Sequence, residues 1–427
     1  MKPSARVQAV IDVIERIPGA RVPMDTIVGD YMRPRRYIGA KDRANIAERV
    51  YGIIRAQARL NWWLKKSGAG DTPRLYVLAY LVLAEGAGEK RMDDLFDGSK
   101  HSPATLDEQE RILIKKLEGK PFIGTDMPEA VRTECPPEHE EKLREIFGKD
   151  FRAEMEAMID PAPLDLRVNI WSANRDEVKK SLEKDGVETL ETPYSPWGLR
   201  CKEKSFLSKT KALTKGYIQI QDEGSQLIAY VCGAKPGMQV LDYCAGAGGK
   251  TLALAAAMQR KGRIVATDND EKRLAKGKMR FKKSGLADII EVRALSEERH
   301  RKWLRRQKGT FDVVLADVPC TGSGTWRRNP DMRWQSYGPG LDELVKVQSE
   351  ILAKIAPVVK PGGRLVYATC SLFKEENENQ IEAFLKAHEE YKIVPVDERF
   401  GNPYMRLTPR HHGTDGFFAA VLERKKQ

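Results

Sequence analysis

The second half of the chain alternates short apolar strands with helical patterns, and this alternation restricts the fold more than any other feature. From about Gly216 onward, helical segments separate a series of strand-like runs. The expected strands are 238–244, 263–270, 289–294, 311–318, 364–370, 391–396 and 417–424. Such alternation predicts an α/β fold, a doubly wound and mostly parallel sheet with helices on both faces. In a sheet of this kind the ligand binds at the carboxyl ends of the strands.

The first third of the chain has a different pattern, and a short mixed segment separates it from the sheet. Residues from about 5 to 135 carry apolar positions at helical spacing, as in 4–17, where Ser4 is the expected cap, and in the longer segment 40–64. A proline-rich junction, one strand, one capped helix and a loop follow. A chain of 427 residues is long enough for two to three domains. We expect three domains: a helical domain over 1–145, a small α+β lobe over 146–215 and a Rossmann-like domain over 216–427.

The charge balance is basic, and much of the surplus lies in one segment. The chain has 73 Lys and Arg against 61 Asp and Glu, a formal net charge of +12. Residues 271–308 alone hold fourteen Lys and Arg against five Asp and Glu, and Arg327, Arg328 and Arg333 follow soon after. This surplus favours a polyanionic partner, with nucleic acid the commonest, over a merely solvated basic surface.

Apolar segments long enough for a membrane are not found in the sequence. Charges interrupt every apolar run in residues 1–20, which is not the pattern of a signal peptide. The longest strongly apolar run, 75–84, has half of the roughly 20 residues that a transmembrane helix needs. We therefore expect a cytoplasmic protein with reduced thiols and no membrane contact.

Two of the six cysteines stand where a ligand is expected to bind. Cys320 and Cys370 each follow a predicted central strand of the sheet. No two of the six cysteines have C-x-x-C spacing, and no histidine cluster accompanies them, so we expect no metal site. A structural disulfide is disfavoured in the cytoplasm. Two readings remain from the residues alone, buried inert thiols and reactive thiols.

The turn after the first strand of the sheet, residues 241–251, is rich in glycine. Gly246, Gly248 and Gly249 allow a tight turn and a close approach of the backbone to a ligand at the helix start. The turn does not fit a phosphate-binding P-loop, because Cys244 stands at the first glycine of that pattern. A dinucleotide pattern also fails at its third glycine, where the chain has Thr251. Asp242, the turn and Asp268 at the end of the next strand fit S-adenosyl-L-methionine at least as well as NAD.

Three motifs together carry a family resemblance. The segments 236–251, 317–334 and 367–378 resemble the Sun/Fmu family of RNA cytosine carbon-5 methyltransferases. The resemblance extends through 221–229 and through the last strand, and the segment 167–199 is similar to the family's small RNA-binding lobe. The helical start is similar to the NusB-like domain of the bacterial branch typified by ribosomal RNA small subunit methyltransferase B. The resemblance implies a Rossmann-like class I S-adenosylmethionine-dependent methyltransferase sheet behind these two RNA-binding parts.

The resemblance also implies roles for the site residues. It gives Cys370 as the nucleophile, Cys320 as the thiol that assists release, and Lys250 and Asp317 as further catalytic residues. The residues implied in cofactor binding are Cys244, Ala245, Gly246, Ala247, Gly248, Gly249, Lys250, Asp268, Arg273 and Asp317. Carbon 5 of cytosine is a poor nucleophile until a thiolate adds to carbon 6, which explains the need for an activated cysteine. The residues themselves do not order the two cysteines, since a Pro-Cys nucleophile is also chemically sensible.

One position departs from the family pattern. The family carries an acidic residue after its third strand, on the adenine side of the cofactor, and this chain has Ala294 and Leu295 there. The residue that contacts the adenine side therefore stays open.

The expected partner is RNA. The NusB-like start favours 16S ribosomal RNA, and transfer RNA is the main alternative substrate of the same reaction. Trp326 and Trp334 have two readings, stacking on bases and packing in a core. A non-catalytic RNA-binding factor is the rival from another functional class, but it predicts erosion of the thiols or of the glycine turn, and both are intact. A base or ribose methyltransferase without covalent catalysis would leave both cysteines unexplained. We expect the protein to act as a monomer.

Overall fold

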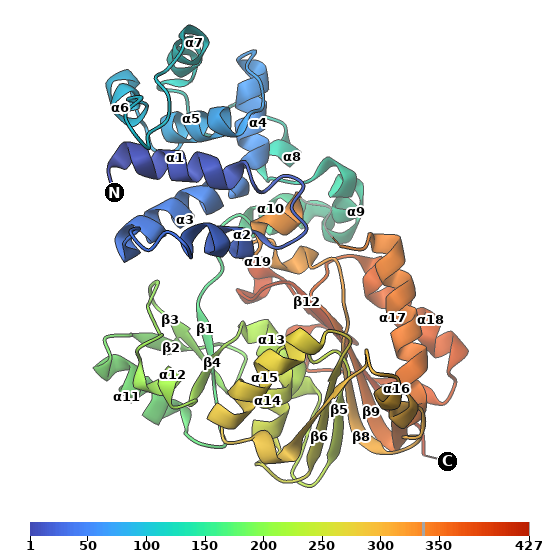
Figure 1. The fold of residues 1–427 in the computed structure, drawn as a ribbon. Coiled ribbons are helices and arrows are strands. Elements are labelled where there is room, and N and C mark those ends of the chain that lie inside the picture. The colour runs from blue at the N-terminus through green and yellow to red at the C-terminus, as the bar shows by residue number, and fades with distance from the viewer. Residues whose placement is uncertain (335–337, 427) are drawn as a thin grey trace. The chain divides into compact units, whose positions relative to one another are not determined.

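The computed structural model describes residues 1–334 and 338–426 (Figure 1). The chain forms two compact units. One unit comprises Met1–Asp160 with Trp326–Pro339, and the other comprises Pro161–Thr325 with Gly340–Gln427. In residues 1–334 and 338–426, no helix has both the length and the apolar character that a membrane span requires.

The first unit is helical, as its apolar spacing predicts. Its helices are α1 Pro3–Ile14, α2 Met24–Met32, α3 Ala40–Arg55, α4 Gln57–Lys66, α5 Pro73–Leu83, α6 Glu89–Leu95, α7 Glu108–Leu117, α8 Glu129–Arg132, α9 Pro137–Phe147 and α10 Phe151–Ala157. Val7, Val10 and Ile14 lie one turn apart on α1 and are buried in a single core with the other helices.

Two details of the helical unit differ from the expectation. Ser4 was expected to cap the first helix, but the cap position is Lys2, and Ser4 lies inside α1 with its hydroxyl directed to the Asp97 carboxylate. Pro3 at the first helical position explains the earlier start, because its fixed φ suits a helix N-terminus. The long pattern over 40–64 is divided into α3 and α4 at Ala56, which has a non-helical ψ of 17°.

The segment that follows the first cysteine motif packs into the helical unit. Trp326 is buried, and its ring stacks on His139 with centroids 6.2 Å apart. The indole N–H of Trp334 donates to the Ile54 carbonyl at 3.1 Å. Both tryptophans therefore have the packing role, the commoner of the two that their sequence allowed.

Two of the three arginines of this segment do not extend the basic surface. Arg327 and Arg333 were expected to add to it, but both are buried. Arg333 donates to the Met158 carbonyl at 2.9 Å and lies over the ring of Trp326, 5.1 Å from its centroid. The expectation was wrong because these side chains serve the interior of the helical unit.

The second unit contains a large mixed sheet, at the lower right of Figure 1. Its strands are β5 Gln239–Asp242, β6 Arg263–Asp268, β7 Ile290–Ala294, β8 Phe311–Asp317, β9 Val359–Thr369, β10 Tyr391–Val394, β11 Met405–Leu407 and β12 Phe417–Arg424. The order is β10-β12-β9-β8-β5-β6-β7, and β11 pairs with β12. Strands β5 to β9 pair in parallel, and β10 to β12 are antiparallel. All seven predicted strands are present, and β11 was not predicted.

Helices cover both faces of this sheet. They are α13 Glu223–Val231, α14 Gly249–Ala257, α15 Glu271–Lys283, α16 Glu298–Arg305, α17 Leu341–Ile355, α18 Glu378–Ala387 and α19 Pro409–His412. Val240 of β5 packs in one core with α13, α14 and α15, whereas its neighbour Leu241 packs in a second core with α16, α17 and α18. This alternation follows from the two-residue period of a strand.

A small antiparallel sheet precedes the large one. Its strands are β1 Asp165–Val168, β2 Thr189–Glu191, β3 Gly198–Cys201 and β4 Ile218–Ile220, in the order β2-β3-β1-β4. The helices of this lobe are α11 Arg175–Lys184, which begins with a capping box at Asn174, and α12 Lys211–Thr214. Strand β4 follows the expected domain boundary at 215 and pairs with β1.

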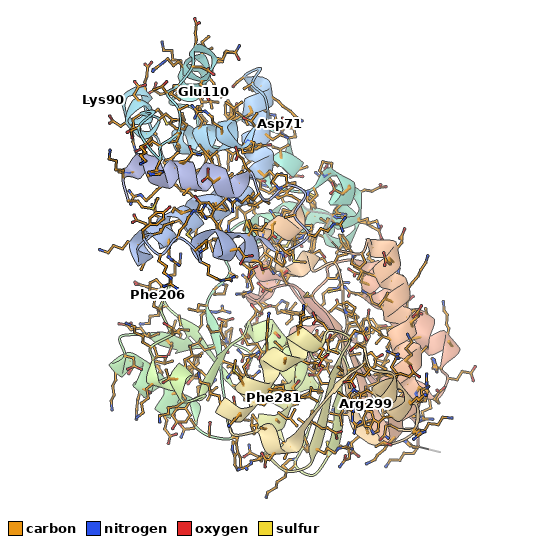
Figure 2. The ribbon with its side chains drawn as sticks, viewed as in Figure 1. Asp71, Lys90, Glu110, Phe206, Phe281 and Arg299 are labelled. Carbon is orange, nitrogen blue, oxygen red and sulfur yellow. The ribbon has the colours of Figure 1, made fainter. Side chains whose placement is uncertain are left out.

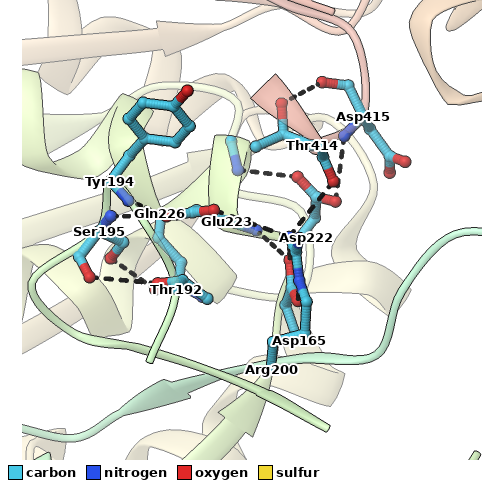
Figure 3. A network of polar contacts seen from close by, with 12 residues as sticks. Asp165, Thr192, Tyr194, Ser195, Arg200, Asp222, Glu223, Gln226, Thr414 and Asp415 are labelled. Atoms are coloured by element: carbon cyan, nitrogen blue, oxygen red, sulfur yellow. Dashed lines mark hydrogen bonds and ion pairs between the residues drawn. The ribbon is translucent and has the colours of Figure 1, made fainter. Parts of the chain in front are cut away.

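A buried polar network attaches the small lobe to the large sheet's helices (Figure 3). The Glu223 carboxylate at the start of α13 accepts the backbone N–H groups of Tyr194 and Ser195 at 2.6 and 2.7 Å. Asp165 of β1 pairs with Arg200 of β3 at 2.6 Å and accepts the N–H of Glu223 at 3.1 Å. Burial raises the pKa of Glu223, although both N–H groups oppose the change. This network holds β1 against the start of α13, and Arg167 of the same strand reaches the first residue of α14.

Candidate active site

The two cysteines lie side by side at the carboxyl ends of neighbouring parallel strands. Cys320 follows β8 and Cys370 follows β9, and the two sulfurs are 3.4 Å apart. Both side chains are half-buried. The sequence placed each thiol at a strand end, and the pairing of β8 with β9 brings them into contact.

The surroundings of Cys320 disfavour its charged form. The hydrogen bond to Cys370 is the largest influence that raises the pKa of Cys320 well above its usual value, followed by burial and by the charges of Cys370 and Glu376. The backbone N–H of Gly322 acts in the opposite direction without overcoming them. A thiol in these surroundings keeps its proton at neutral pH.

Lys250 and Asp317 form an ion pair beside the thiols. The ammonium of Lys250, in the first turn of α14, is 2.6 Å from an Asp317 carboxylate oxygen at the end of β8. Burial lowers the pKa of Lys250, but the carboxylate of Asp317 and the nearby Cys370 outweigh it, and the net change is upward. The lysine is therefore a stable cation within electrostatic reach of Cys370.

The glycine turn between β5 and α14 is held by the neighbouring backbone and by two arginines. Ala245 donates its N–H to the Thr267 carbonyl at 2.8 Å. Arg280 of α15 donates to the Ala247 carbonyl at 2.9 Å, and Arg167 of β1 donates to the Gly249 carbonyl at 2.6 Å. The sequence analysis did not identify either arginine, although an arginine inside the predicted strand 164–170 could have indicated a buried polar role.

Gly248 is required by its packing as well as by its backbone. It has φ of +75°, and a Cβ there would lie 2.2 Å from the Phe281 ring. Phe281 is a buried residue of α15 and is marked in Figure 2. A side chain at Gly248 would therefore collide with the interior of the sheet's helical layer.

The residues around the turn fit S-adenosylmethionine. The Asp268 carboxylate accepts the N–H groups of Gly246 and Asp270, each at 2.8 Å, which fixes its orientation at the end of β6. One oxygen of buried Asp242 accepts the Thr251 hydroxyl at 2.7 Å, and the other has no hydrogen-bond partner. Burial raises the pKa of Asp242 to about 7. An acceptor of this kind suits the ammonium group of an amino acid, and a fixed carboxylate suits ribose hydroxyls.

Arg273 and Cys244 also lie at the turn. The guanidinium of Arg273 is 2.7 Å from the position that a Cβ on Gly246 would take, so this side chain covers the turn from α15. Burial, followed by the charges of Asp268 and Asp317, raises the pKa of Cys244 well above its usual value. Cys244 is thus a neutral thiol among the residues at the turn.

Where the family has an acidic residue, Ala294 and Leu295 make hydrogen bonds through their backbone groups. Leu295 donates its N–H to the Asp268 carbonyl at 2.8 Å, and the Ala294 carbonyl is 2.8 Å from Nδ1 of His300. Neither residue offers a side-chain acceptor, in agreement with the departure noted in the sequence.

A buried carboxylate, Glu376, was also missed from the sequence. It belongs to the short 3-10 turn Lys374–Glu376 after Cys370 and is fully buried. It accepts the N–H and the hydroxyl of Thr321 at 2.9 and 2.6 Å. The acidic cluster in 375–378 was part of the family motif, but its pattern alone does not show which carboxylate turns inward.

Comparison with known proteins decides the family. The protein family described as "16S rRNA methyltransferase RsmB/F" matches residues 229–423 of this chain. The probable ribosomal RNA small subunit methyltransferase B of Synechocystis sp. is 30% identical over 418 residues, which cover 90% of this chain and 91% of the relative. The chain belongs to the RsmB/F methyltransferase family. The family prediction made from the cysteine motifs and the glycine turn is confirmed.

Solved structures share the fold of this RsmB/F member. The crystal structure of PH0851 has a TM-score of 0.81 at 30% identity and covers 99% of both chains. A methyltransferase homolog protein from Pyrococcus horikoshii has a TM-score of 0.59 at 30% identity and covers 69% of this chain and 97% of its own. The RsmF/B-like ferredoxin-like domain matches residues 140–205, which include β1 to β3. The predicted class I methyltransferase fold with a helical start is confirmed.

We expect Asp268→Ala to weaken S-adenosylmethionine binding by about 1–3 kcal/mol, because a charged acceptor for the ribose is lost. Isothermal titration calorimetry measures the change. Asp288→Ala is the matched control, since Asp288 pairs with Arg260 on the surface and has no role at the turn. Equal affinity in the wild type and both variants would remove Asp268 from the cofactor site.

Proposed function

We infer that this protein methylates carbon 5 of a cytosine in RNA with S-adenosyl-L-methionine, through a covalent adduct at carbon 6. The observation that carries the proposal is the pair of sulfurs 3.4 Å apart, with the Lys250–Asp317 ion pair beside them. A methyltransferase that methylates a nucleophilic nitrogen or oxygen needs no thiol. Carbon 5 of cytosine, by contrast, must first be activated by a thiolate.

The reaction assigns a separate task to each cysteine. The Cys370 thiolate adds to carbon 6, which moves electron density to carbon 5. When bound, the cofactor would supply the methyl group from its sulfonium, and the neutral thioether that remains would be the leaving group. Carbon 5 then loses its proton to solvent water, the bond between Cys370 and carbon 6 breaks, and the electron pair returns to the Cys370 sulfur. Cys320 assists this release, in line with the family resemblance.

The electrostatics support this order of the two cysteines. Lys250 is a cation near Cys370, and a cation favours a thiolate. Cys320 lies among groups that raise its pKa, so it is the proton-bearing member of the pair. Asp317, held by Lys250, is the proposed contact to the cytosine ring.

The basic helix α15 is the proposed RNA contact. Its exposed lysines have no acidic partner among the described residues: Lys272, Lys276, Lys278, Lys282 and Lys283. The arginines of α16 differ, since Arg301 and Arg305 pair with Glu298 and the exposed Arg299 in Figure 2 pairs with Glu297. Unpaired cations are free to release counterions from phosphates, so α15 is favoured over α16 within the basic segment 271–308.

We expect the triple variant Lys272→Glu, Lys276→Glu, Lys283→Glu to bind RNA more weakly and with less dependence on salt. Each lost phosphate contact lowers the slope of log affinity against log salt by about 0.7 for single-stranded RNA. Filter binding at several salt concentrations measures the slope. The matched control reverses Arg299, Arg301 and Arg305 of α16 and is expected to change the slope less. A larger change in the control would move the RNA path to α16.

The proposed substrate is 16S ribosomal RNA, methylated in the cytoplasm by a monomer. The relatives named ribosomal RNA small subunit methyltransferase B support this choice over transfer RNA. A non-catalytic RNA-binding role is disfavoured because the thiols, the lysine and the glycine turn are all in place.

The test is methylation of purified RNA by the wild-type protein with S-adenosylmethionine, followed by sequencing of 5-methylcytosine. The expected result is one modified cytosine in 16S ribosomal RNA and none in transfer RNA. Modification of transfer RNA alone would replace the substrate and keep the chemistry. The absence of 5-methylcytosine from both RNAs would overturn the proposal.

A further inference from the structure

The carboxylate of Glu376 is tied to both sides of the loop that carries Cys320. It accepts the N–H and the hydroxyl of Thr321, the residue after Cys320. It also accepts the side-chain amide of Gln348 at 2.9 Å, and the same amide nitrogen donates to the carbonyl of Pro319 at 3.0 Å. Residues 319 and 321 are therefore fixed around Cys320 by one buried group and its amide partner.

This carboxylate is buried and is held by uncharged donors. Its three contacts all come from donors, which suits the ionised form, since an ionised carboxylate accepts on both oxygens. Glu376 and Gln348 are both fully buried. Among the described residues, no lysine or arginine pairs with Glu376. A second anion beside such a group is costly, because charges interact strongly away from water.

The two thiols thus face charges of opposite sign. Cys370 has the Lys250 ammonium within electrostatic reach, and Cys320 has the Glu376 carboxylate. Tyr367 of β9 is a further titratable group near Cys320 and is itself buried, with its hydroxyl donating to the Glu376 carbonyl at 2.6 Å. The Cys370 thiol is the remaining neighbour of Cys320.

We propose that Glu376 is a positioning residue that keeps Cys320 in the thiol form before substrate binds, so that Cys370 alone carries the reactive charge. The inference rests on the proposed function, since it explains how two adjacent thiols keep different tasks. The elevated pKa of Cys320, to which the Cys370 hydrogen bond, burial and the Glu376 charge contribute, is consistent with it.

The test measures how fast each cysteine reacts with iodoacetamide across pH. Initial rates at substoichiometric reagent are read by mass spectrometry of the peptides that contain Cys320 and Cys370, without RNA or cofactor. In the wild type, Cys370 is expected to react at lower pH than Cys320. In Glu376→Gln, the midpoint of Cys320 is expected to fall by about one pH unit or more, because the neighbouring anion is gone.

Two controls separate the charge from the loop contacts. Glu378→Gln removes a nearby carboxylate that pairs with Arg406 and is expected to leave both midpoints unchanged. Thr321→Val removes one hydrogen bond to Glu376 but leaves the charge of Glu376 in place. It is expected to shift the midpoint of Cys320 far less than Glu376→Gln does.

Two outcomes would overturn the proposal. A Cys320 midpoint that stays in place in folded Glu376→Gln would leave Glu376 only a structural role. If that variant does not fold, the wild-type rates still test the proposal. Reaction of Cys320 at lower pH than Cys370 in the wild type would overturn the proposal. The measurement needs neither RNA nor methyl transfer, so it tests this proposal separately from the proposed reaction. Failure of the proposed reaction would instead appear as the absence of 5-methylcytosine with the wild-type protein.

Discussion

Cys370→Ala is expected to abolish RNA methylation without forming a covalent adduct, whereas Cys320→Ala accumulates RNA bound through Cys370. The reason is the order of bond changes. Without the Cys370 thiolate nothing adds to carbon 6, and without Cys320 the adduct forms and is methylated but is released slowly. A denaturing gel with substrate RNA and S-adenosylmethionine is expected to show a slowly migrating band for Cys320→Ala alone.

The control for this experiment is Cys135→Ala. Cys135 is a buried thiol of the helical unit, and burial raises its pKa to about 12, so its removal tests the loss of a thiol outside the unit that holds the site. It is expected to retain activity and to show no band. A band for Cys370→Ala would instead make Cys320 the nucleophile. Methylation retained in both Cys370→Ala and Cys320→Ala would leave the two cysteines with a packing role only.

The sheet and the location of the site were accessible from the sequence because they depend on local patterns. Strand and helix periodicity predicted β5 to β10 and β12, and the strand-end rule placed Cys320 and Cys370 at one edge. The contact between the sulfurs needed one more fact, that β8 and β9 are adjacent. Chain order does not give adjacency in a doubly wound sheet, since β5 also pairs with β8 although two strands lie between them in sequence.

Partners distant in sequence were not accessible. Glu376 contacts Thr321 across 55 residues, and Arg167 reaches the Gly249 carbonyl across 82. The pairing of Arg301 with Glu298 could have been predicted from helical spacing, because the two are three residues apart, but a net charge over 271–308 does not show it. Arg333 was misread as a surface group, and the sequence left two readings open for Trp326, because burial depends on contacts with residues distant in sequence, such as Met158 and His139.

The importance of Gly248 was predicted correctly from the sequence, but the reason given for it was incomplete. The pattern predicted that Gly248 must stay small so that a ligand can approach. In the structure its missing Cβ faces Phe281, and Arg273 covers Gly246. A large residue at Gly248 would therefore disturb the layer between α14 and α15 as well as the ligand site, which makes Asp268→Ala the cleaner probe of the cofactor.

Lys250→Met is expected to lower kcat by on the order of 10² or more, since a buried cation aimed at developing charge is worth that much in other enzymes. The lysine has two anionic neighbours, Asp317 at 2.6 Å and the thiolate form of Cys370. Its removal leaves Asp317 without its partner in the pair and makes the Cys370 thiolate harder to form. The acidic limb of the pH–rate profile is therefore expected to move to higher pH by about one unit or more.

The sign of that shift follows from the charge. A cation favours the thiolate, so without it more alkaline solution is needed to reach the same thiolate fraction, and the deficit of the variant is expected to shrink as pH rises. Single-turnover methylation from pH 6 to pH 10 measures this. Lys250→Arg is the matched control, because it retains the charge and is expected to keep the wild-type limb at a reduced rate. A limb that stays in place while the rate of Lys250→Met falls would show that the lysine acts through Asp317 and the cytosine ring rather than through the nucleophile.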